Sequence, residues 1–68
     1  MNRKGLKMTL KELRKNKNLT LEKLSKKVGL SFQALSLYEQ GLRKPKIETI
    51  KKLADALEVS VEEIINCF

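Results

Sequence analysis

Residues 20–41 read TLEKLSKKVGLSFQALSLYEQG, and this stretch decides the fold. Thr20 is typical of a helix N-cap, and Gly29 can take the left-handed backbone conformation that ends a helix. Ser31 caps the next helix only two residues later, and that helix runs to the break at Gly41. Because so short a link forces a sharp turn, the stretch is predicted to form a helix-turn-helix unit.

Two side chains inside the stretch fit this geometry. Ser25 is small at the point where the two helices must approach most closely. Leu35 follows Gly29 by six residues, where it can fill the angle between the helices. We therefore place the helix-turn-helix at about residues 20–40.

Signals for the start of a helix also occur on both sides of this stretch. Thr9 with Glu12 and Ser60 with Glu63 form capping boxes, which satisfy the free backbone N–H groups at a helix start. Apolar residues recur at helical spacing in Ile47, Ile50, Leu53, Ala54 and Leu57, and then in Val61, Ile64, Ile65 and Phe68. No segment alternates at period two for long enough to form a strand. The predicted fold is all-α, a compact five-helix bundle that forms a single domain over residues 1–68.

Composition excludes several classes of function. The chain has 68 residues, no histidine and one cysteine, Cys67. A disulfide framework, a Cys/His zinc site and a His-based catalytic triad are therefore excluded. No apolar run approaches the roughly 20 residues that cross a bilayer. We expect no enzyme activity, no cofactor, no metal and no membrane partner.

The formal charge of +7 is unevenly distributed. Residues 1–18 carry seven basic groups against one acid, whereas residues 47–68 carry two lysines against five acids. Arg43, Lys44 and Lys46 form a separate basic segment after the helix-turn-helix. A basic N-terminal part and an acidic C-terminal part give the protein one surface that can bind a polyanion. Nucleic acid is the leading candidate for that polyanion.

The run TLEKLSKKVGLSFQALSLYEQGLRKPKIETIKKLADALEVSVEEII resembles the Cro/lambda-repressor-like helix-turn-helix family, also called the xenobiotic-response-element type. The resemblance implies a bacterial or phage, sequence-specific regulator of transcription, with a repressor preferred over an activator. It implies a homodimer on a double-stranded DNA operator, working in the cytoplasm. It also implies a structural ion pair between Arg14 and Glu39, which would clamp the recognition helix to the scaffold.

A helical wheel with Leu35 pointing inward sorts the recognition helix, residues 31–40. In the resembling family, outward positions of this helix read base edges in the major groove. The predicted base-reading set is Gln33, Ser36, Leu37, Phe32 and Gln40. Gln33 could bind adenine through two hydrogen bonds, and the apolar members could touch thymine methyl groups. This favours a half-site rich in A·T pairs.

Phosphate contacts are predicted at two kinds of position. Helix starts offer free backbone N–H groups to anions, and the basic segment should follow the backbone of the same duplex. The predicted phosphate-binding set is Thr20, Leu21, Ser31, Arg43, Lys44 and Lys46. Capping is the alternative role of the Thr20 and Ser31 hydroxyls.

Three apolar residues stand where many relatives place polar ones, namely Leu21, Phe32 and Leu37. Leu21 fits the edge of the core, Phe32 lies nearer the core than Gln33, and Leu37 points away from it on the wheel. If exposed together, the three would form a protein-binding patch. The alternative function is therefore a protein-interaction module on the same fold.

The acidic C-terminal part is the predicted place for contact between two copies of the chain. Ile64, Ile65 and Phe68 form an apolar stripe that either completes the core or provides a homodimer interface. Such a stripe more often completes a core, and the two-fold symmetry of operators keeps the second possibility open. Cys67 is interpreted as a small apolar residue near the terminus.

Overall fold

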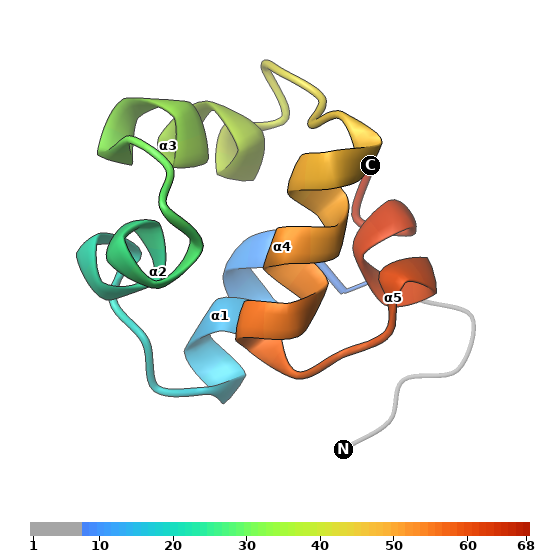
Figure 1. The fold of residues 1–68 in the computed structure, drawn as a ribbon, viewed down its shortest axis with the longest axis horizontal. Coiled ribbons are helices and arrows are strands. Elements are labelled where there is room, and N and C mark those ends of the chain that lie inside the picture. Colours follow the sequence, from blue (N-terminus) through green and yellow to red (C-terminus); the bar gives the residue numbers. More distant parts are fainter. Residues whose placement is uncertain (1–7) are drawn as a thin grey trace.

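The computed structural model describes residues 8–68, which form five α-helices and no strand (Figure 1). The helices are α1 (Leu10–Asn16), α2 (Leu21–Val28), α3 (Phe32–Gln40), α4 (Ile47–Leu57) and α5 (Val61–Ile65). The predicted all-α class and the helix-turn-helix formed by α2 and α3 are confirmed. The basic residues Arg3, Lys4 and Lys7, which contribute to the predicted basic N-terminal part, lie outside the described residues.

Hydroxyl side chains begin four of these helices. The caps are Thr9, Thr20, Ser31 and Ser60, and each accepts a hydrogen bond from the backbone N–H three residues later, at 3.0–3.1 Å. The capping boxes of α1 and α5 are complete, since Glu12 and Glu63 accept in return from the N–H groups of Thr9 and Ser60. The start of α4 at Lys46 has no side-chain cap.

The ends of α1 to α4 share a second local pattern. Each helix is followed by a residue with positive φ, at Asn18 (57°), Gly29 (74°), Gly41 (75°) and Glu58 (58°). The next residue is apolar every time, and its N–H donates to a carbonyl five residues back at 3.0–3.2 Å. This is the bond of a Schellman motif, which ends a helix and turns the chain sharply.

The core lies where α4 meets the other helices. The side chains that are fully buried are Leu24, Leu35, Leu53, Leu57 and Ile64. They come from α2, α3, α4 and α5, and α1 adds Leu10 and Leu13. Burying each large aliphatic side chain contributes about 1.5–3 kcal/mol, so this cluster is the main force holding the short helices together.

Two predicted core residues are not in the core. Ile47 is 50% exposed and Ile65 is 47% exposed. Ile47 opens α4 and Ile65 closes α5, and these two ends lie near each other beside the C-terminus (Figure 1). A helical wheel gives the direction of a side chain but does not show whether another helix is long enough to cover it. None of the five described helices covers Ile47 or Ile65.

None of the helices formed by residues 8–68 combines the length and apolar character needed to cross a membrane.

Candidate nucleic-acid interface

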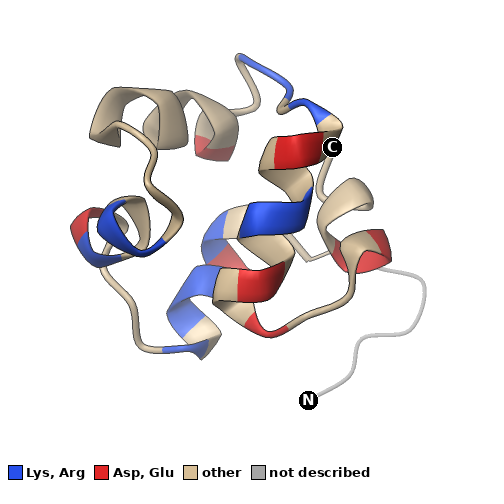
Figure 2. Ribbon diagram, viewed as in Figure 1, with Lys and Arg blue, Asp and Glu red and all other residues tan. Residues whose placement is uncertain are grey.

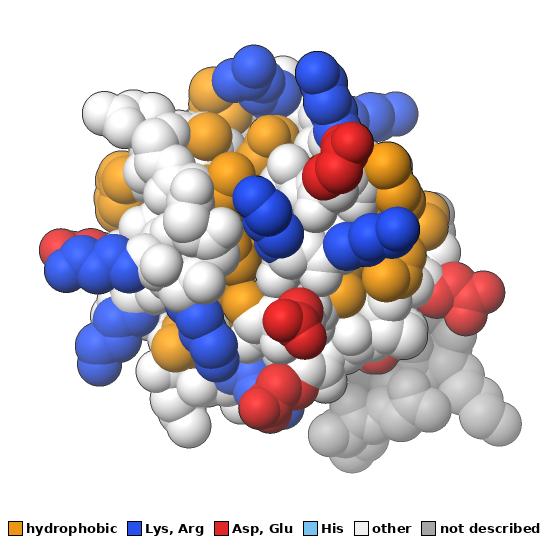
Figure 3. All heavy atoms as spheres, in the orientation of Figure 1, with side chains coloured by type: hydrophobic (Ala, Val, Ile, Leu, Met, Phe, Trp, Pro, Cys, Tyr) orange, Lys and Arg blue, Asp and Glu red, His pale blue; other side chains and the backbone are white. Residues whose placement is uncertain are grey.

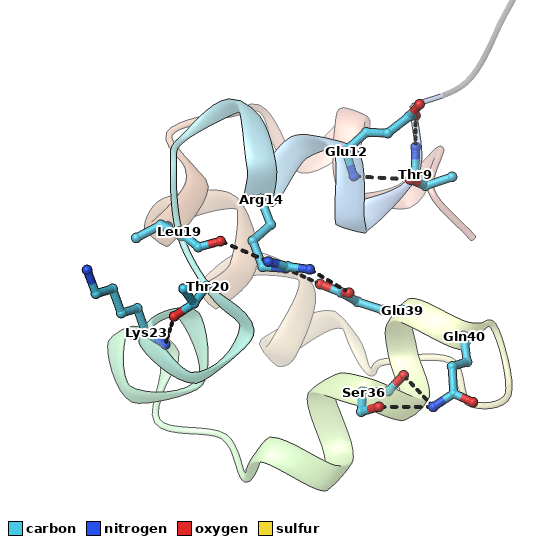
Figure 4. Close-up of polar contacts among 9 residues, drawn as sticks. All are labelled: Thr9, Glu12, Arg14, Leu19, Thr20, Lys23, Ser36, Glu39 and Gln40. Atoms are coloured by element: carbon cyan, nitrogen blue, oxygen red, sulfur yellow. Dashed lines mark hydrogen bonds and ion pairs between the residues drawn. The ribbon is translucent and has the colours of Figure 1, made fainter.

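A buried ion pair fixes the position of α3 relative to α1. The Arg14 guanidinium donates through Nε to Glu39 Oε2 at 2.6 Å and through the second terminal nitrogen to Oε1 at 3.2 Å (Figure 4). Its remaining nitrogen donates to the Leu19 carbonyl at 2.8 Å. Both charged side chains are only 9% exposed. The predicted ion pair is present, and because Arg14 is committed to these partners it is not available to phosphate.

The outer surface of α3 carries the uncharged polar groups that were predicted to read bases. Gln33 and Gln40 are exposed, Ser36 is half-buried, and Leu35 on the opposite side has no exposed surface. Phe32 is 52% exposed, so it lies outside the core rather than close to it. Gln33 has no hydrogen-bond partner among residues 8–68, so both ends of its amide are free for a ligand.

Ser36 and Gln40 are hydrogen-bonded to each other. The Gln40 amide nitrogen, Nε2, donates to Ser36 Oγ at 2.9 Å and to the Ser36 carbonyl at 3.2 Å (Figure 4). The two residues lie four apart on the helix, the spacing that brings side chains together on one face. The two residues were predicted to read bases separately, although their spacing in the sequence already indicates this contact.

Positive charge surrounds α3 without lying on it. The helix has no lysine or arginine, and its one charged residue, Glu39, belongs to the ion pair. Exposed basic residues flank it in α2 and in the following loop (Figure 2), at Lys23, Lys26, Lys27, Arg43, Lys44 and Lys46. The basic side chains of that loop project from the surface at one end of the molecule (Figure 3). The three loop cations have no ion-pair partner within the described part of the chain.

The helix starts at Thr20 and Ser31 are exposed and have capping hydroxyls. Each hydroxyl accepts from the backbone, so the alternative capping role is confirmed, and each keeps its own proton for donation. The first N–H groups of α2, including that of Leu21, have no partner within the helix. The positive end of the helix dipole therefore offers an anion site there by backbone alone.

The predicted apolar patch of three residues does not form. Leu21 is half-buried and packs against the core, as its alternative role required. Leu37 is half-buried rather than exposed. The Leu42 N–H donates to the Leu37 carbonyl at 3.0 Å, which places the two residues at positions that a Schellman motif commonly pairs. Only Phe32 of the three is well exposed.

Leu42 is the exposed apolar residue that the sequence analysis missed. It is 70% exposed, whereas the residues in the equivalent place after α1, α2 and α4 pack against the core. Along the chain it lies between α3 and the loop cations. The sequence indicates this exposure, because Leu42 stands between Gly41 and the basic segment that begins at Arg43.

The three residues of the predicted dimer stripe differ in their burial. Ile64 is completely buried, so its assignment to an interface is wrong, because α5 uses this residue to pack on the core. Ile65 is exposed. Phe68 is half-buried and meets the Tyr38 ring edge-on, with 6.4 Å between the ring centroids. The terminal residue therefore supports α3 from behind.

Residues 8–68 contain no cluster of three or more His, Cys, Asp or Glu side chains that could hold a metal ion. The Cys67 thiol donates to the Glu63 carbonyl at 3.3 Å. Burial, with the nearby Glu63 and Glu12 carboxylates, raises the pKa of the Cys67 thiol to about 11. At neutral pH the group is a protonated thiol and a poor nucleophile.

A helix-turn-helix with an uncharged polar outer face, flanked by cations and anchored by a buried ion pair, has the architecture of a DNA-binding domain. Comparison with known families agrees, since the family model described as "Helix-turn-helix" matches residues 10–64. The chain belongs to this helix-turn-helix family. The resemblance seen in the sequence is thereby confirmed.

Several curated bacterial proteins are similar to the chain. The cryptic phage CTXphi transcriptional repressor RstR of Vibrio cholerae is 36% identical over 59 residues, which are 87% of this chain and 53% of RstR. The uncharacterized HTH-type transcriptional regulator y4dJ of Sinorhizobium fredii is 43% identical over 54 residues, 79% of this chain and 70% of that protein. The HTH-type transcriptional activator BcrR of Enterococcus faecalis is 33% identical over 57 residues, 84% of this chain and 28% of BcrR.

The chain spans about half the length of RstR and of several other curated relatives that it matches. No solved structure matches the chain.

Proposed function

We propose that this chain is a transcriptional regulator that recognises a specific sequence in double-stranded DNA, with α3 in the major groove. The observation that carries the proposal is the free Gln33 amide on the outer face of α3, flanked by the exposed cations of α2 and of the loop. Glutamine can bind adenine through two hydrogen bonds, and lysine and arginine neutralise phosphates. The preferred half-site is rich in A·T pairs. No enzymatic step is part of this function.

The first test separates contacts to phosphate from contacts to bases. Arg43→Ala should weaken binding to all duplexes alike and reduce the slope of log affinity against log salt by about 1. Lys15→Ala removes the same charge from the end of α1, far from the α3–α4 loop (Figure 1), and should change neither quantity. Gln33→Ala should leave the salt slope unchanged and relax base preference at one position, by about 1–3 kcal/mol.

Selection of bound sequences from random duplex DNA gives the decisive result. A wild-type protein that enriches no sequence would contradict sequence-specific recognition. If Gln33→Ala leaves binding unchanged while Phe32→Asp abolishes a complex with another protein, the alternative of a protein-interaction module is correct. Phe32 and Leu42 are the exposed apolar residues on which that alternative now depends.

A measurement in cells decides whether the protein represses or activates transcription. RstR is named a repressor, and repression is the mode proposed for this chain, acting in the cytoplasm where a bacterial chromosome lies. A selected operator placed across a promoter should lower expression of a reporter gene when the protein is present. An increase that is lost in Gln33→Ala would instead indicate an activator.

The proposed functional state is a homodimer bound to two half-sites. Ile65 and Ile47 are exposed near each other, where α5 ends and α4 begins, and apolar side chains gather over this side of the molecule (Figure 3). Ile65→Glu should lower the dimer fraction in sedimentation at a given concentration. The selected operator should contain two half-sites about one helical turn apart. A monomeric protein that selects a single half-site would refute the dimer.

A further inference from the structure

We infer that Ser36 and Gln40 read the edge of one base as a unit and that the unit selects adenine. This inference rests on the proposed function and adds to it the chemistry of a second reading position, separate from Gln33. It follows from the two hydrogen bonds that Gln40 donates to Ser36 and from what those bonds leave free.

The orientation of the Gln40 amide is fixed by the Ser36 carbonyl. A carbonyl oxygen can only accept, so the amide must turn its nitrogen toward it, at 3.2 Å. The same nitrogen donates to Ser36 Oγ at 2.9 Å. Rotating the amide by half a turn would bring two carbonyl oxygens together and lose the bond to the Ser36 carbonyl, leaving only a bond in which the Ser36 hydroxyl donates to the amide oxygen. The amide oxygen of Gln40 is therefore held outward on an exposed side chain.

The same contact determines what Ser36 can offer to a ligand. Its Oγ already accepts from Gln40, and within residues 8–68 no group accepts a hydrogen bond from its hydroxyl proton. Ser25 behaves differently, because its hydroxyl donates to the Glu22 carbonyl at 2.7 Å. The Ser36–Gln40 pair thus presents a hydroxyl donor from one residue and an amide acceptor from the other.

A donor beside an acceptor matches one base edge of the major groove better than the others. Adenine offers N7 as an acceptor and the N6 amino group as a donor, so both members of the pair are satisfied. Guanine offers two acceptors, N7 and O6, and the Gln40 oxygen would face O6. Cytosine could satisfy only the Gln40 oxygen, and thymine only the Ser36 hydroxyl. An unlocked glutamine could turn its amide, and the lock removes that freedom.

The test compares base preference in Ser36→Ala, Gln40→Ala and the double variant, using sequences selected from random duplex DNA. In the wild type, one position should favour adenine over guanine by roughly 5- to 150-fold, the range for a good bidentate contact. Each single variant should relax that same position. The double variant should relax it no further than the larger single effect, because either change destroys the unit.

Two further variants sharpen the result. Gln40→Glu retains an outward acceptor but cannot donate to Ser36, so the preference should move from adenine toward cytosine, whose N4 group donates. Gln33→Ala is the matched control and should relax a different position while leaving this one intact. Thermal unfolding of each variant should match the wild type, since Gln40 is exposed and Ser36 is only half-buried.

The outcomes separate this inference from the function on which it rests. A wild-type protein that enriches no sequence overturns both. A wild-type preference that Ser36→Ala does not change, or that Ser36→Ala and Gln40→Ala change at different positions or additively, overturns only the paired reading. In that case the Ser36–Gln40 contact is an ordinary surface contact between side chains four residues apart.

Discussion

Replacing Arg14 with methionine tests how α3 is held in place. The substitution keeps an unbranched apolar stem, shorter than arginine, and removes all three hydrogen bonds of the guanidinium. The Glu39 carboxylate, 9% exposed, then remains buried without its counter-ion. Removing one partner of a buried pair costs about 3–5 kcal/mol, and the remaining exposure favours the lower end, about 3 kcal/mol.

That loss is large for a chain of this size. A domain of 68 residues has a free energy of unfolding of roughly 3–10 kcal/mol at the usual value per residue. A loss of about 3 kcal/mol should lower the melting temperature by roughly 12–24 °C. Urea unfolding followed by circular dichroism measures the change directly. We expect Arg14→Met to approach the limit of stability at room temperature.

A surface ion pair in the same protein provides the control. Lys17 Nζ lies 3.2 Å from Glu58 Oε1, and the two side chains are 39% and 71% exposed. Such pairs contribute about 0–1 kcal/mol, so Lys17→Met should have little effect. If Arg14→Met destabilises the protein no more than Lys17→Met, the proposed role of the Arg14–Glu39 pair is wrong.

Replacing both Arg14 and Glu39 with methionine distinguishes two contributions to stability. One is the attraction between the two charges, and the other is the cost of burying one charge without its partner. Each single variant buries one charge alone, whereas the double variant buries none. Apolar replacements of buried pairs are often neutral or stabilising. We therefore expect the double variant to be more stable than either single variant. A double variant as unstable as the sum of the two would show that packing, rather than charge pairing, explains the losses.

Three further changes test other parts of the fold. Gly29→Ala should cost about 1–2 kcal/mol in urea unfolding through backbone strain alone, since φ is +74° and an added Cβ would meet no atom within 4 Å. Ser60→Ala should cost about 1 kcal/mol, because it removes the acceptor for the Glu63 N–H, and an unchanged midpoint would show that this cap does not matter. The pKa of Cys67 is raised from 9.0 to about 11, so its contribution to stability is present below pH 9 and is lost as the pH rises to about 11. The difference in unfolding free energy between the wild type and Cys67→Ala should therefore change over that interval and stay constant between pH 6 and 8.

Local patterns predicted the helices well because caps are local interactions. A hydroxyl that accepts from an N–H three residues later needs nothing from the rest of the chain, and all four predicted hydroxyl caps are present. The apolar residue after each left-handed cap is an equally local signal. At Leu42 it marks the end of α3 without any tertiary information.

Contacts between distant parts of the chain were harder to predict. Arg14 and Glu39 are 25 residues apart, and only the family resemblance suggested that they meet. Ile47 and Ile65 have the periodicity of core residues, yet they lie at helix ends beyond the reach of a covering helix. Periodicity records the direction of a side chain, and the extent of the neighbouring elements decides its burial.

The distribution of charge suggests that affinity and specificity are physically separate in this surface. No cation lies on α3, so its variants should not change the number of counterions released from DNA. Under the proposed function, the loop cations Arg43 and Lys44 would contact phosphates, which are the same for every sequence. Substitutions of Gln33, Ser36 or Gln40 should therefore alter base preference at a constant salt slope, whereas substitutions of Arg43 or Lys44 should alter the slope at a constant preference. A variant of α3 that changed the slope would show that the helix also determines how closely the flanking cations approach the backbone.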